Sequence, residues 1–264
     1  MGRLELPGYD AIGIRADNAS PFTLAGTNTW IVSREPAFMI DPGPNLREHL
    51  DALSDEIDER GGLGAILLTH DHHDHAEAVP EMLMRFSPSP LAAARGAVTT
   101  VLADGDSYGP FSVLAVPGHA PDHLVFLWQG VAFTGDAVLG EGSVFVAPDP
   151  GALRGYLSGL TRLRGLAPTV LAPGHGPVIT AADTKLAEYI EHRLDREEQL
   201  VLALDAGLRT VDELLDAAWP DVHVALRPAA ALTLAAHLDK LDEEGRLPAG
   251  VERPEWPVSW LPAV

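Results

Sequence analysis

The chain has 264 residues and 46% hydrophobic residues, which suits a globular protein with one large domain and a small appendage. Its formal net charge of −20 repels phosphates at long range and so disfavours general binding to nucleic acid. The absence of cysteine excludes disulfides, cysteine nucleophiles and thiolate ligands, so any metal must be held by nitrogen or oxygen donors.

The first residues carry no targeting signal that the sequence makes visible. They lack the apolar core of a signal peptide, and Leu6 stands where a myristoylation motif requires Ser or Thr. No apolar run approaches the length of a membrane span. We therefore expect a cytoplasmic protein without a membrane partner.

The first predicted helix follows an apolar stretch, residues 38–40, that ends at Asp41. Residues 45–60 place leucine and isoleucine on one helical stripe, and Gly61 and Gly62 end the pattern. Asn45 is a candidate N-cap, with Glu48 three residues later. We expect this helix to cover one face of a sheet.

A buried strand is predicted over residues 65–69, because a continuous apolar run is bounded there by Gly64 and a polar cluster. The cluster, residues 70–75, reads His-Asp-His-His-Asp-His. If alternate residues converge, His73 faces away from the others and lies at the surface. A second helix is expected from Ala76 towards Arg85.

The same arrangement of an apolar run, a glycine and one metal-binding side chain recurs three times. The runs are residues 113–116, 131–134 and 169–172, and the side chains that follow them are His119, Asp136 and His175. Glycine permits the sharp turn that presents the next side chain. Four strand ends therefore deliver donors to one edge, and imidazole with carboxylate suits Zn²⁺, Mn²⁺ or Fe.

These donors exceed what one tetrahedral ion can use. The candidate ligands are His70, His72, Asp74, His75, His119, Asp136 and His175. Two metals are implied, roughly 3.5–4 Å apart, with a shared carboxylate and a shared water or hydroxide.

The sequence resembles the metallo-β-lactamase superfamily, whose HxHxDH motif appears here at residues 70–75. The resemblance implies an α/β fold, the αββα metallo-β-lactamase sandwich. It also implies that His70, His72 and His119 hold the first metal, that Asp74, His75 and His175 hold the second, and that Asp136 bridges them. Asp74 and Asp136 are thus the expected catalytic carboxylates, and Asp41 falls where the family keeps a structural aspartate behind the ligands.

A closer resemblance is to the β-lactamase-like branch that includes a mitochondrial single-strand endoribonuclease and fungal polyketide thioesterases. Residues 18–30 look like its N-terminal signature, and the pair Asp122-His123 and the segment 192–198 are also similar. Because the superfamily's substrates are diverse, this fold does not decide the substrate.

Beyond Thr180 the pattern becomes helical. Thr180 with Asp183, and Thr210 with Glu213, resemble capping pairs that open a long helix and a helix over residues 211–218. Pro228 begins another helix that runs to about Glu244. We expect a catalytic domain over residues 1–180 and a helical, winged-helix-like domain over residues 181–264.

The charge of this C-terminal part disfavours nucleic-acid binding. Residues 205–264 carry eleven acidic and five basic side chains. We expect the tail to pack on the catalytic domain, contribute to a homodimer or close one side of the substrate pocket.

Several residues near the motifs are candidates for substrate or supporting roles. Asp71 is expected to accept a hydrogen bond from a ligand imidazole and fix its tautomer. His123 either lines the pocket as a proton donor or satisfies a backbone carbonyl. The remaining candidates share one helical face and would either grip an anionic substrate or form a domain-interface salt bridge; they are Tyr189, His192, Arg193 and Arg196. Histidines without a partner in motif or spacing are expected to be structural, namely His49, His223 and His237.

The predicted function is a dinuclear zinc hydrolase, with two Zn²⁺ per chain and Mn²⁺ or Fe as alternatives. A hydroxide that bridges the metals would attack a small-molecule thioester, ester or lactone. No G-x-S-x-G elbow supports a serine nucleophile. One alternative is a single-strand endoribonuclease, which requires a basic groove containing Arg193 and Arg196 that leads to the metals. Another is an iron-dependent redox enzyme such as a persulfide dioxygenase.

Overall fold

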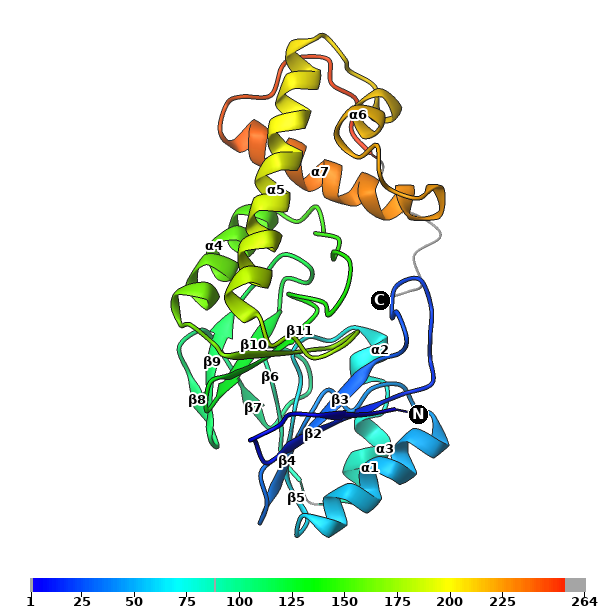
Figure 1. Ribbon diagram of the computed structural model, residues 1–264, viewed down its shortest axis with the longest axis vertical. Helices are drawn as coiled ribbons and strands as arrows, with labels where there is room; N and C mark the ends of the chain where they lie inside the picture. The colour runs from blue at the N-terminus through cyan, green and yellow to red at the C-terminus, as the bar shows by residue number, and fades with distance from the viewer. Residues whose placement is uncertain (1, 88, 255–264) are drawn as a thin grey trace.

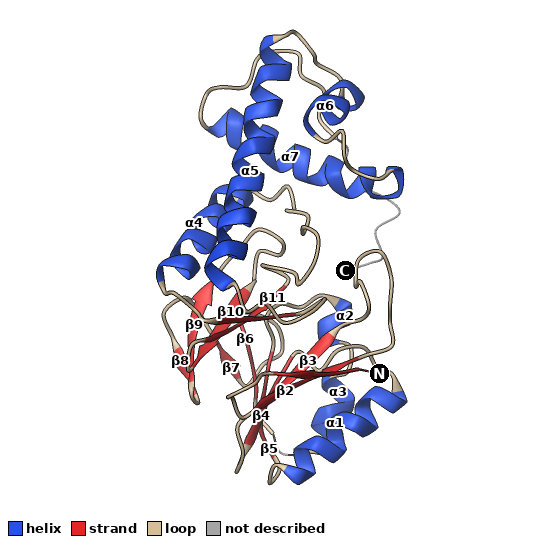
Figure 2. Cartoon of the chain, viewed as in Figure 1, coloured by secondary structure: helices blue, strands red, loops and turns tan. Residues whose placement is uncertain are grey.

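The computed structural model describes residues 2–87 and 89–254. Two sheets lie face to face with helices on their outer sides, and a helical domain stands beyond one helix layer (Figure 1; Figure 2). The predicted αββα sandwich with a C-terminal helical domain is confirmed. Residues 255–264, which end the predicted C-terminal domain, lie outside the described residues.

The first sheet contains seven strands in sequence order. They are β1 (Gly2–Glu5), β2 (Ala11–Arg15), β3 (Asn28–Val32), β4 (Ala37–Ile40), β5 (Leu63–Leu67), β6 (Leu91–Ala93) and β7 (Thr100–Val101). β4 and β5 pair in parallel, with Ile40 opposite Leu67. Their carboxyl ends therefore meet at one edge, where Asp41 and the histidine-rich loop begin. The predicted strand at residues 65–69 begins two residues earlier than expected.

The second sheet contains five strands, in the order β12-β11-β10-β9-β8. They are β8 (Ser107–Tyr108), β9 (Phe111–Ala115), β10 (Leu124–Trp128), β11 (Val131–Gly135) and β12 (Val170–Pro173). β11 and β12 are parallel, with Phe133 opposite Ala172. This pairing brings the strand ends that precede Asp136 and His175 side by side.

Apolar side chains from both sheets fill the space between them, including Trp30, Phe126 and Phe133. On the outer face of the first sheet, α1 (Arg47–Glu59) and α3 (Val79–Arg85) bury their apolar sides. The predicted Asn45 cap of α1 is wrong, because the N-cap is Leu46 without a side-chain cap. The backbone N–H of Asn45 donates to the Glu77 carboxylate instead, at 3.0 Å.

The predicted helix over residues 76–85 is split into two. The short α2 (His73–Ala76) carries part of the histidine cluster, and α3 begins three residues after it. The split lets the cluster turn toward the sheet edge while α3 packs on the sheet.

The second sheet is covered by α4 (Ala152–Gly165) and by the first part of α5 (Ala182–Asp205). Leu186 and Tyr189 of α5 belong to the same core as α4. The predicted capping role of Thr180 with Asp183 is wrong, since the N-cap is Ala181 and has no side-chain bond. The Asp183 carboxylate accepts from Arg164 instead, at 2.7 Å.

The C-terminal domain packs on the last turns of α5. Leu200 and Leu204 share its core with α6 (Val211–Ala218) and α7 (Arg227–Glu243), which the 3₁₀ helix η1 (Val224–Leu226) precedes. The predicted capping box of Thr210 and Glu213 is confirmed. Because α5 contributes to two cores, the division at residue 181 stays a prediction, and packing continues across it.

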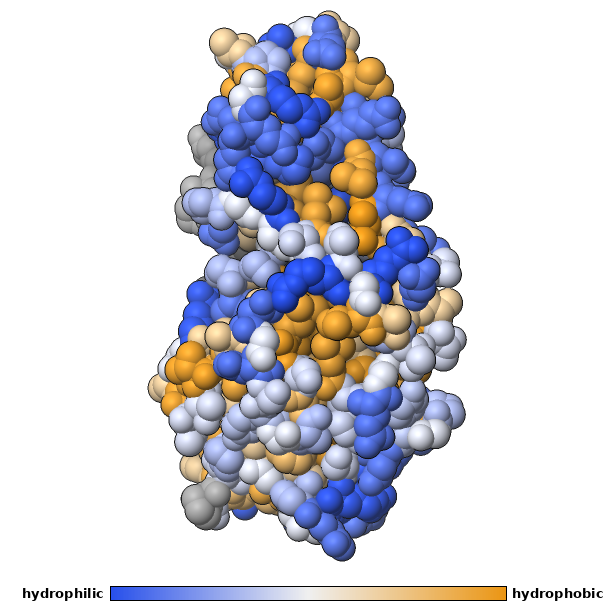
Figure 3. Space-filling model, turned by 90° about the vertical axis from the view of Figure 1, so that its left-hand side faces the viewer, coloured by the Kyte–Doolittle hydropathy of each residue, from blue (hydrophilic) through white to orange (hydrophobic). Residues whose placement is uncertain are grey.

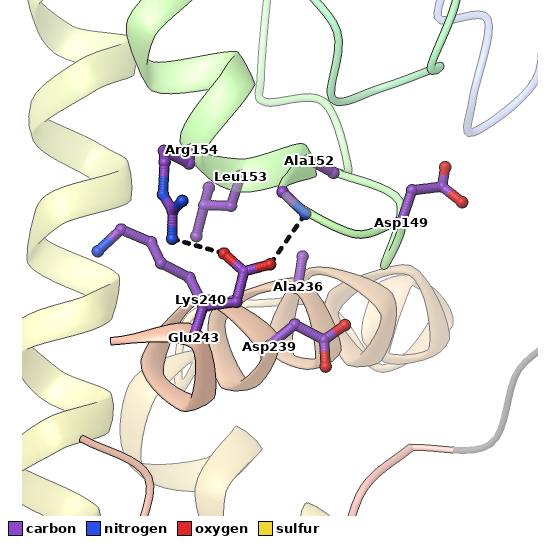
Figure 4. A pocket seen from close by; sticks show the side chains of 9 residues that line it. Asp149, Ala152, Leu153, Arg154, Ala236, Asp239, Lys240 and Glu243 are labelled. Carbon is purple, nitrogen blue, oxygen red and sulfur yellow. Dashed lines mark hydrogen bonds and ion pairs between the residues drawn. The ribbon is translucent and has the colours of Figure 1, made fainter. Parts of the chain in front are cut away.

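A second connection joins the domains at the far end of α7 (Figure 4). The Glu243 carboxylate accepts from the backbone N–H of Gly151, the N-cap of α4, at 3.1 Å and from Arg154 at 2.6 Å. The helical domain is thus attached to the sandwich through α5 and through the start of α4.

The surface mixes apolar and hydrophilic side chains. On the face in Figure 3, apolar areas alternate with hydrophilic ones over the height of the molecule. Among the described residues, no helix combines the length and the apolar character needed to cross a membrane.

Candidate metal centre

Seven predicted donors meet at the edge where β5, β11 and β12 end. The structure brings their donor atoms into three groups, within each of which all atoms lie within 4.8 Å of one another. The groups are His70, His72 and His119; His70, His75 and Asp136; and Asp74, His75 and His175. The first and last correspond to the two ligand sets that the family resemblance implies.

The spacing of these atoms suits a tetrahedral ion. His175 Nε2 lies 3.2 Å from Asp74 Oδ2 and 3.4 Å from Asp136 Oδ2. His119 Nε2 lies 3.6 Å from Asp136 Oδ2. Donors held about 2.0–2.1 Å from a tetrahedral ion stand roughly 3.4 Å apart. Asp136 therefore faces both histidine sets, as a bridging carboxylate must.

Unsatisfied buried atoms provide an independent test of whether the residues fit a metal. Among the described residues, eleven buried side-chain nitrogen or oxygen atoms have no hydrogen-bond partner, and three of them are His70 Nε2, His75 Nε2 and Asp136 Oδ1. A buried polar atom without a partner is costly and rare. All three belong to the donor set, so a cation between them supplies the partner that the protein does not.

The carboxylates of the cluster favour positive charge at His75 and His175, whereas His70 and His72 are held neutral. Burial lowers the pKa of His70, and burial with the neighbouring His119 lowers the pKa of His72 to about 3. Burial would also lower the pKa of His175, but Asp136 and Asp74 outweigh it and raise that pKa to about 9. Carboxylates likewise raise the pKa of His75 well above its ordinary value despite burial. Divalent cations would provide this compensating charge.

Asp41 fixes the orientation of two ligands from behind. Its Oδ2 accepts from His75 Nδ1 at 2.9 Å and from the Thr69 hydroxyl at 2.7 Å. The same hydroxyl lies 2.9 Å from His70 Nδ1 and accepts from it when it donates to Asp41. Both imidazoles then carry their proton on Nδ1, which leaves Nε2 free for a metal.

Glycine is required at two of the strand ends. Gly135 has φ +46°, and a Cβ there would lie 2.4 Å from the Thr69 hydroxyl. A Cβ on Gly174 would lie 2.6 Å from His75 Cε1 and 2.7 Å from Asp136 Oδ1. These glycines give the ligands the space in which they converge.

Two residues inside the motif lie away from the centre. The prediction for Asp71 is wrong, because its carboxylate accepts from Arg95 at 2.7 and 3.0 Å rather than from a ligand imidazole. His73 is exposed, as expected, with 68% of its side-chain surface accessible, and lies 3.6 Å from Glu77.

His123 occupies a position that neither sequence alternative anticipated. It is buried, its ring stacks on His70 with centroids 4.8 Å apart, and its Nε2 accepts from the backbone N–H of Asp136 at 3.1 Å. It therefore does not line the pocket or donate to a carbonyl through that nitrogen. His123 directly precedes β10, the strand next to β11. A side chain that points inward at this position reaches the turn before Asp136, and this position was the signal in the sequence.

Two of the helix-face residues hold the loop beside the metal edge. The Tyr189 hydroxyl accepts from the Leu139 N–H and donates to the Gly142 carbonyl, both at 3.0 Å. Arg193 is buried and donates to the Ser143 hydroxyl at 2.9 Å and to the Val144 carbonyl. The Tyr189 hydroxyl and one terminal nitrogen of Arg193 are thus bound within the protein, whereas Arg193 Nε has no hydrogen-bond partner.

The other two residues of this face lie nearer the C-terminal domain. Arg196 donates to both Asp221 carboxylate oxygens at 2.6 and 2.8 Å and to the Ala218 carbonyl at 2.6 Å. Its Nε lies 3.2 Å from His192 Nε2. Arg196 thus forms a salt bridge, but within residues 181–264 rather than across the predicted domain interface.

The three histidines expected to be structural have such positions. His49 bonds with Thr29 and lies near the Pro42 carbonyl, and burial lowers its pKa to about 4. His223 accepts from the Ala225 N–H at the start of η1, but it is exposed and also lines the cavity described below. His237 is fully buried in the C-terminal domain.

Five of the seven donors line the floor of a cavity of about 940 Å³ that extends to the C-terminal domain; they are His72, Asp74, His119, Asp136 and His175. The loop at residues 20–24, the loop at residues 139–145 and α5 form its sides. Beyond them, the wall includes Asp221, His223 and Thr233. It also includes five residues that the sequence did not single out, namely Trp219, Val222, Leu226, Ala229 and Ala230. They carry no reactive group, so no motif could identify them.

Comparisons with known proteins agree with this architecture. Residues 23–97 match the Metallo-beta-lactamase superfamily, and residues 210–249 match the Beta-lactamase associated winged helix domain. A Beta-lactamase-like protein 2 homolog of Drosophila melanogaster is 31% identical, with 89% of each chain covered. An Atrochrysone carboxyl ACP thioesterase of Aspergillus chevalieri is 34% identical over 73% of this chain and 65% of that protein.

A solved structure extends the likeness to the whole architecture. A metallo-beta-lactamase family protein from Thermus thermophilus superposes with a TM-score of 0.66 and 25% identity, covering 91% of this chain and 95% of that chain. The converged donors, the sandwich and the sequence relationship lead to one conclusion. The chain belongs to the metallo-β-lactamase superfamily of hydrolytic enzymes.

Proposed function

We propose that the protein is a dinuclear zinc hydrolase that acts on a small-molecule thioester, ester or lactone. The observation that carries the proposal is the convergence of seven nitrogen and oxygen donors, five of which line a large, mostly apolar cavity. Mn²⁺ and Fe suit the same donors and remain the alternative metals.

The donors divide into two sets, each of which would hold one metal ion, and one carboxylate that both ions would share. His70, His72 and His119 would hold one ion, His75 and His175 with Asp74 the other, and Asp136 both. Ions bound there would acidify water to supply a nucleophile and would polarise the substrate oxygen. In hydrolysis, water adds to the acyl carbon, the bond to sulfur or oxygen breaks, and the leaving group takes a proton.

The protein contributes orientation and exclusion of water. Asp41 and Thr69 keep His70 and His75 turned toward the metals, and His123 holds the backbone of Asp136. An apolar cavity wall that excludes water strengthens electrostatic interactions at the reacting carbonyl. The fungal relative named as an acyl-carrier thioesterase supports the choice of an acyl substrate.

The endoribonuclease alternative has weaker support. It needs cations that face the cavity and lead to the metals, yet Arg193 is buried against the loop and Arg196 is paired with Asp221. Lys185, the third Lys or Arg among the described cavity residues, lies 3.8 Å from Glu188. A small-molecule partner therefore fits the charges better than RNA does.

Elemental analysis of protein purified without added metal tests the proposal, together with turnover of a thioester and lactone panel and a labelled single-stranded RNA. About two zinc ions per chain and acyl hydrolysis are the expected results. RNA cleavage without acyl hydrolysis would replace the proposal by the endoribonuclease. One iron per chain with neither activity would point to redox chemistry.

A further inference from the structure

The part of the cavity farthest from the metals has a wall of its own. Trp219, Val222 and Leu226 line it from the C-terminal domain, together with Ala229 and Ala230 of α7; Asp221, His223 and Thr233 are its polar members. Apolar side chains predominate there, and the wall and the metal donors line one continuous cavity. A group bound at the wall can therefore belong to the molecule that reacts at the metals.

The polar side chains between the wall and the metals offer little to a polar ligand. The Tyr189 hydroxyl already makes two hydrogen bonds to backbone groups. The guanidinium of Arg193 is bound to the loop, and that of Arg196 is bound to Asp221 and Ala218. These hydrogen bonds to other parts of the protein are not available to a ligand, although Lys185, Glu188 and His192 also line the cavity.

Opposite the C-terminal wall, the sandwich also offers apolar surface. Phe22 and Leu24 come from the loop before β3, and Phe145 comes from the loop that Arg193 holds. The volume, about 940 Å³, is near the top of the range of about 300–1,000 Å³ that small-molecule sites occupy. An acetyl group would leave most of this space unfilled.

We propose that this distal wall binds the apolar acyl group of the substrate, which is a medium-length aliphatic chain, and that the C-terminal domain thereby sets the preference for acyl length. The inference rests on the proposed acyl hydrolysis and narrows its substrate class. The carbonyl lies at the metal donors while the chain extends towards Val222 and Leu226. Burial of each methylene at such a wall raises affinity about fourfold.

Two neighbouring residues provide a matched pair for a test. Leu226 lines the cavity with 36% of its surface exposed, whereas Val224, two residues earlier in η1, is 72% exposed and does not line it. Leu226→Asp places a charge in the wall, and Val224→Asp places the same charge on the same short helix outside it. Ala229→Phe is a second variant, which fills space in the wall without adding charge.

The experiment uses the full, zinc-loaded chain and straight-chain thioesters of a small thiol, from acetyl to decanoyl. For the wild type, kcat/KM is expected to rise about three- to fourfold per methylene over the buried part of the chain. Leu226→Asp should lower kcat/KM for decanoyl at least tenfold and for acetyl less than twofold, and Val224→Asp should leave both unchanged. Ala229→Phe should move the optimum to shorter chains.

A binding measurement distinguishes the inference from the proposed function. Calorimetry with a non-hydrolysable decyl thioether should show binding with a negative heat-capacity change, weakened by Leu226→Asp and not by Val224→Asp. Hydrolysis that is insensitive to chain length would overturn the inference and leave the proposed function intact. Binding of the thioether without hydrolysis of any acyl substrate would overturn the proposed function and the acyl assignment that rests on it, and would leave only an apolar binding wall. Neither binding nor hydrolysis would overturn both.

Discussion

The two ends of the cavity are built in opposite ways. At the metal edge, seven side chains from four strand ends and one short helix converge, and most are buried with their second polar atom held by the protein. At the distal wall, apolar residues of one small domain provide surface rather than directed bonds. The precise placement of side chains at the donor end determines which reaction is possible. The volume and polarity of the distal wall determine which substrate fits.

Loss of the shared carboxylate should have the largest effect. Asp136→Ala removes the group that faces both donor sets, so we expect the metal content to fall and kcat/KM to drop on the order of 1,000-fold. Elemental analysis and thioester turnover measure the two effects. The exposed Asp55→Ala serves as a control that should change neither. Full metal occupancy with unchanged turnover would remove Asp136 from this role.

Substitution behind the ligands should have a smaller effect at the same end. The Thr69 hydroxyl and the His75 imidazole both donate to the same carboxylate oxygen of Asp41. Asp41→Asn keeps the shape of the side chain but removes its negative charge and replaces one acceptor oxygen by an amide nitrogen. We expect zinc affinity to fall about 10- to 100-fold, measured by competition with a chelator. Binding of the decyl thioether should be unaffected. An equal loss in zinc affinity for Asp55→Asn would show that the effect is not specific to this position.

His123 tests whether the metal edge depends on a buried bond that touches no metal. In His123→Leu the N–H of Asp136 loses its acceptor, and we expect a loss of about 1–3 kcal/mol in the free energy of unfolding. His123→Gln offers an amide oxygen and should recover part of both stability and zinc affinity. Urea unfolding of the metal-free chain separates folding from metal binding. Equal behaviour of the two variants would contradict this positioning role.

The smallest effect is expected in the C-terminal domain and depends on pH. The imidazole of His237, the ammonium of Lys240 and the guanidinium of Arg246 hold the pKa of Glu197 at about 2, below its ordinary 4.5. A carboxyl with a lowered folded-state pKa stabilises the fold above its unfolded pKa, and the contribution is lost as the pH falls from about 4.5 to 2.

We therefore expect Glu197→Gln to cost about 1–2 kcal/mol at pH 7 and progressively less as the pH falls through this window. Urea unfolding of wild type and variant across pH 3–7 measures the difference. Zinc content should be the same in both proteins at neutral pH. A stability difference that does not change with pH would show that the charge of Glu197 is not its contribution.

The sequence predicted the convergence of the seven donor side chains because the signals there are local. An apolar run, a glycine and a donor occupy adjacent positions, and parallel strands such as β11 and β12 bring their ends together. The capping box of Thr210 is equally local and was also predicted. In both cases the residues that decide the geometry lie within a few positions of one another.

The incorrect predictions concern side chains whose partners are distant in sequence. Asp71 is bound by Arg95, and Asp183 is bound by Arg164. His123 reaches an N–H on the neighbouring strand. Each residue had a plausible local role, and packing supplied another partner. The distal wall had no signal at all, because apolar residues of a small helical domain look the same whether they face its core or a ligand.

The continuity of α5 has a consequence for exchange of the C-terminal domain between proteins. The helix belongs to the sandwich core near Leu186 and to the C-terminal core near Leu200. The helical turns between these two residues therefore fix the position and orientation of the distal wall relative to the sandwich. One residue inserted in those turns would rotate the distal wall by about 100° and shift it about 1.5 Å along the axis. A chimera that gains a new acyl preference must therefore keep the helical phase across its junction.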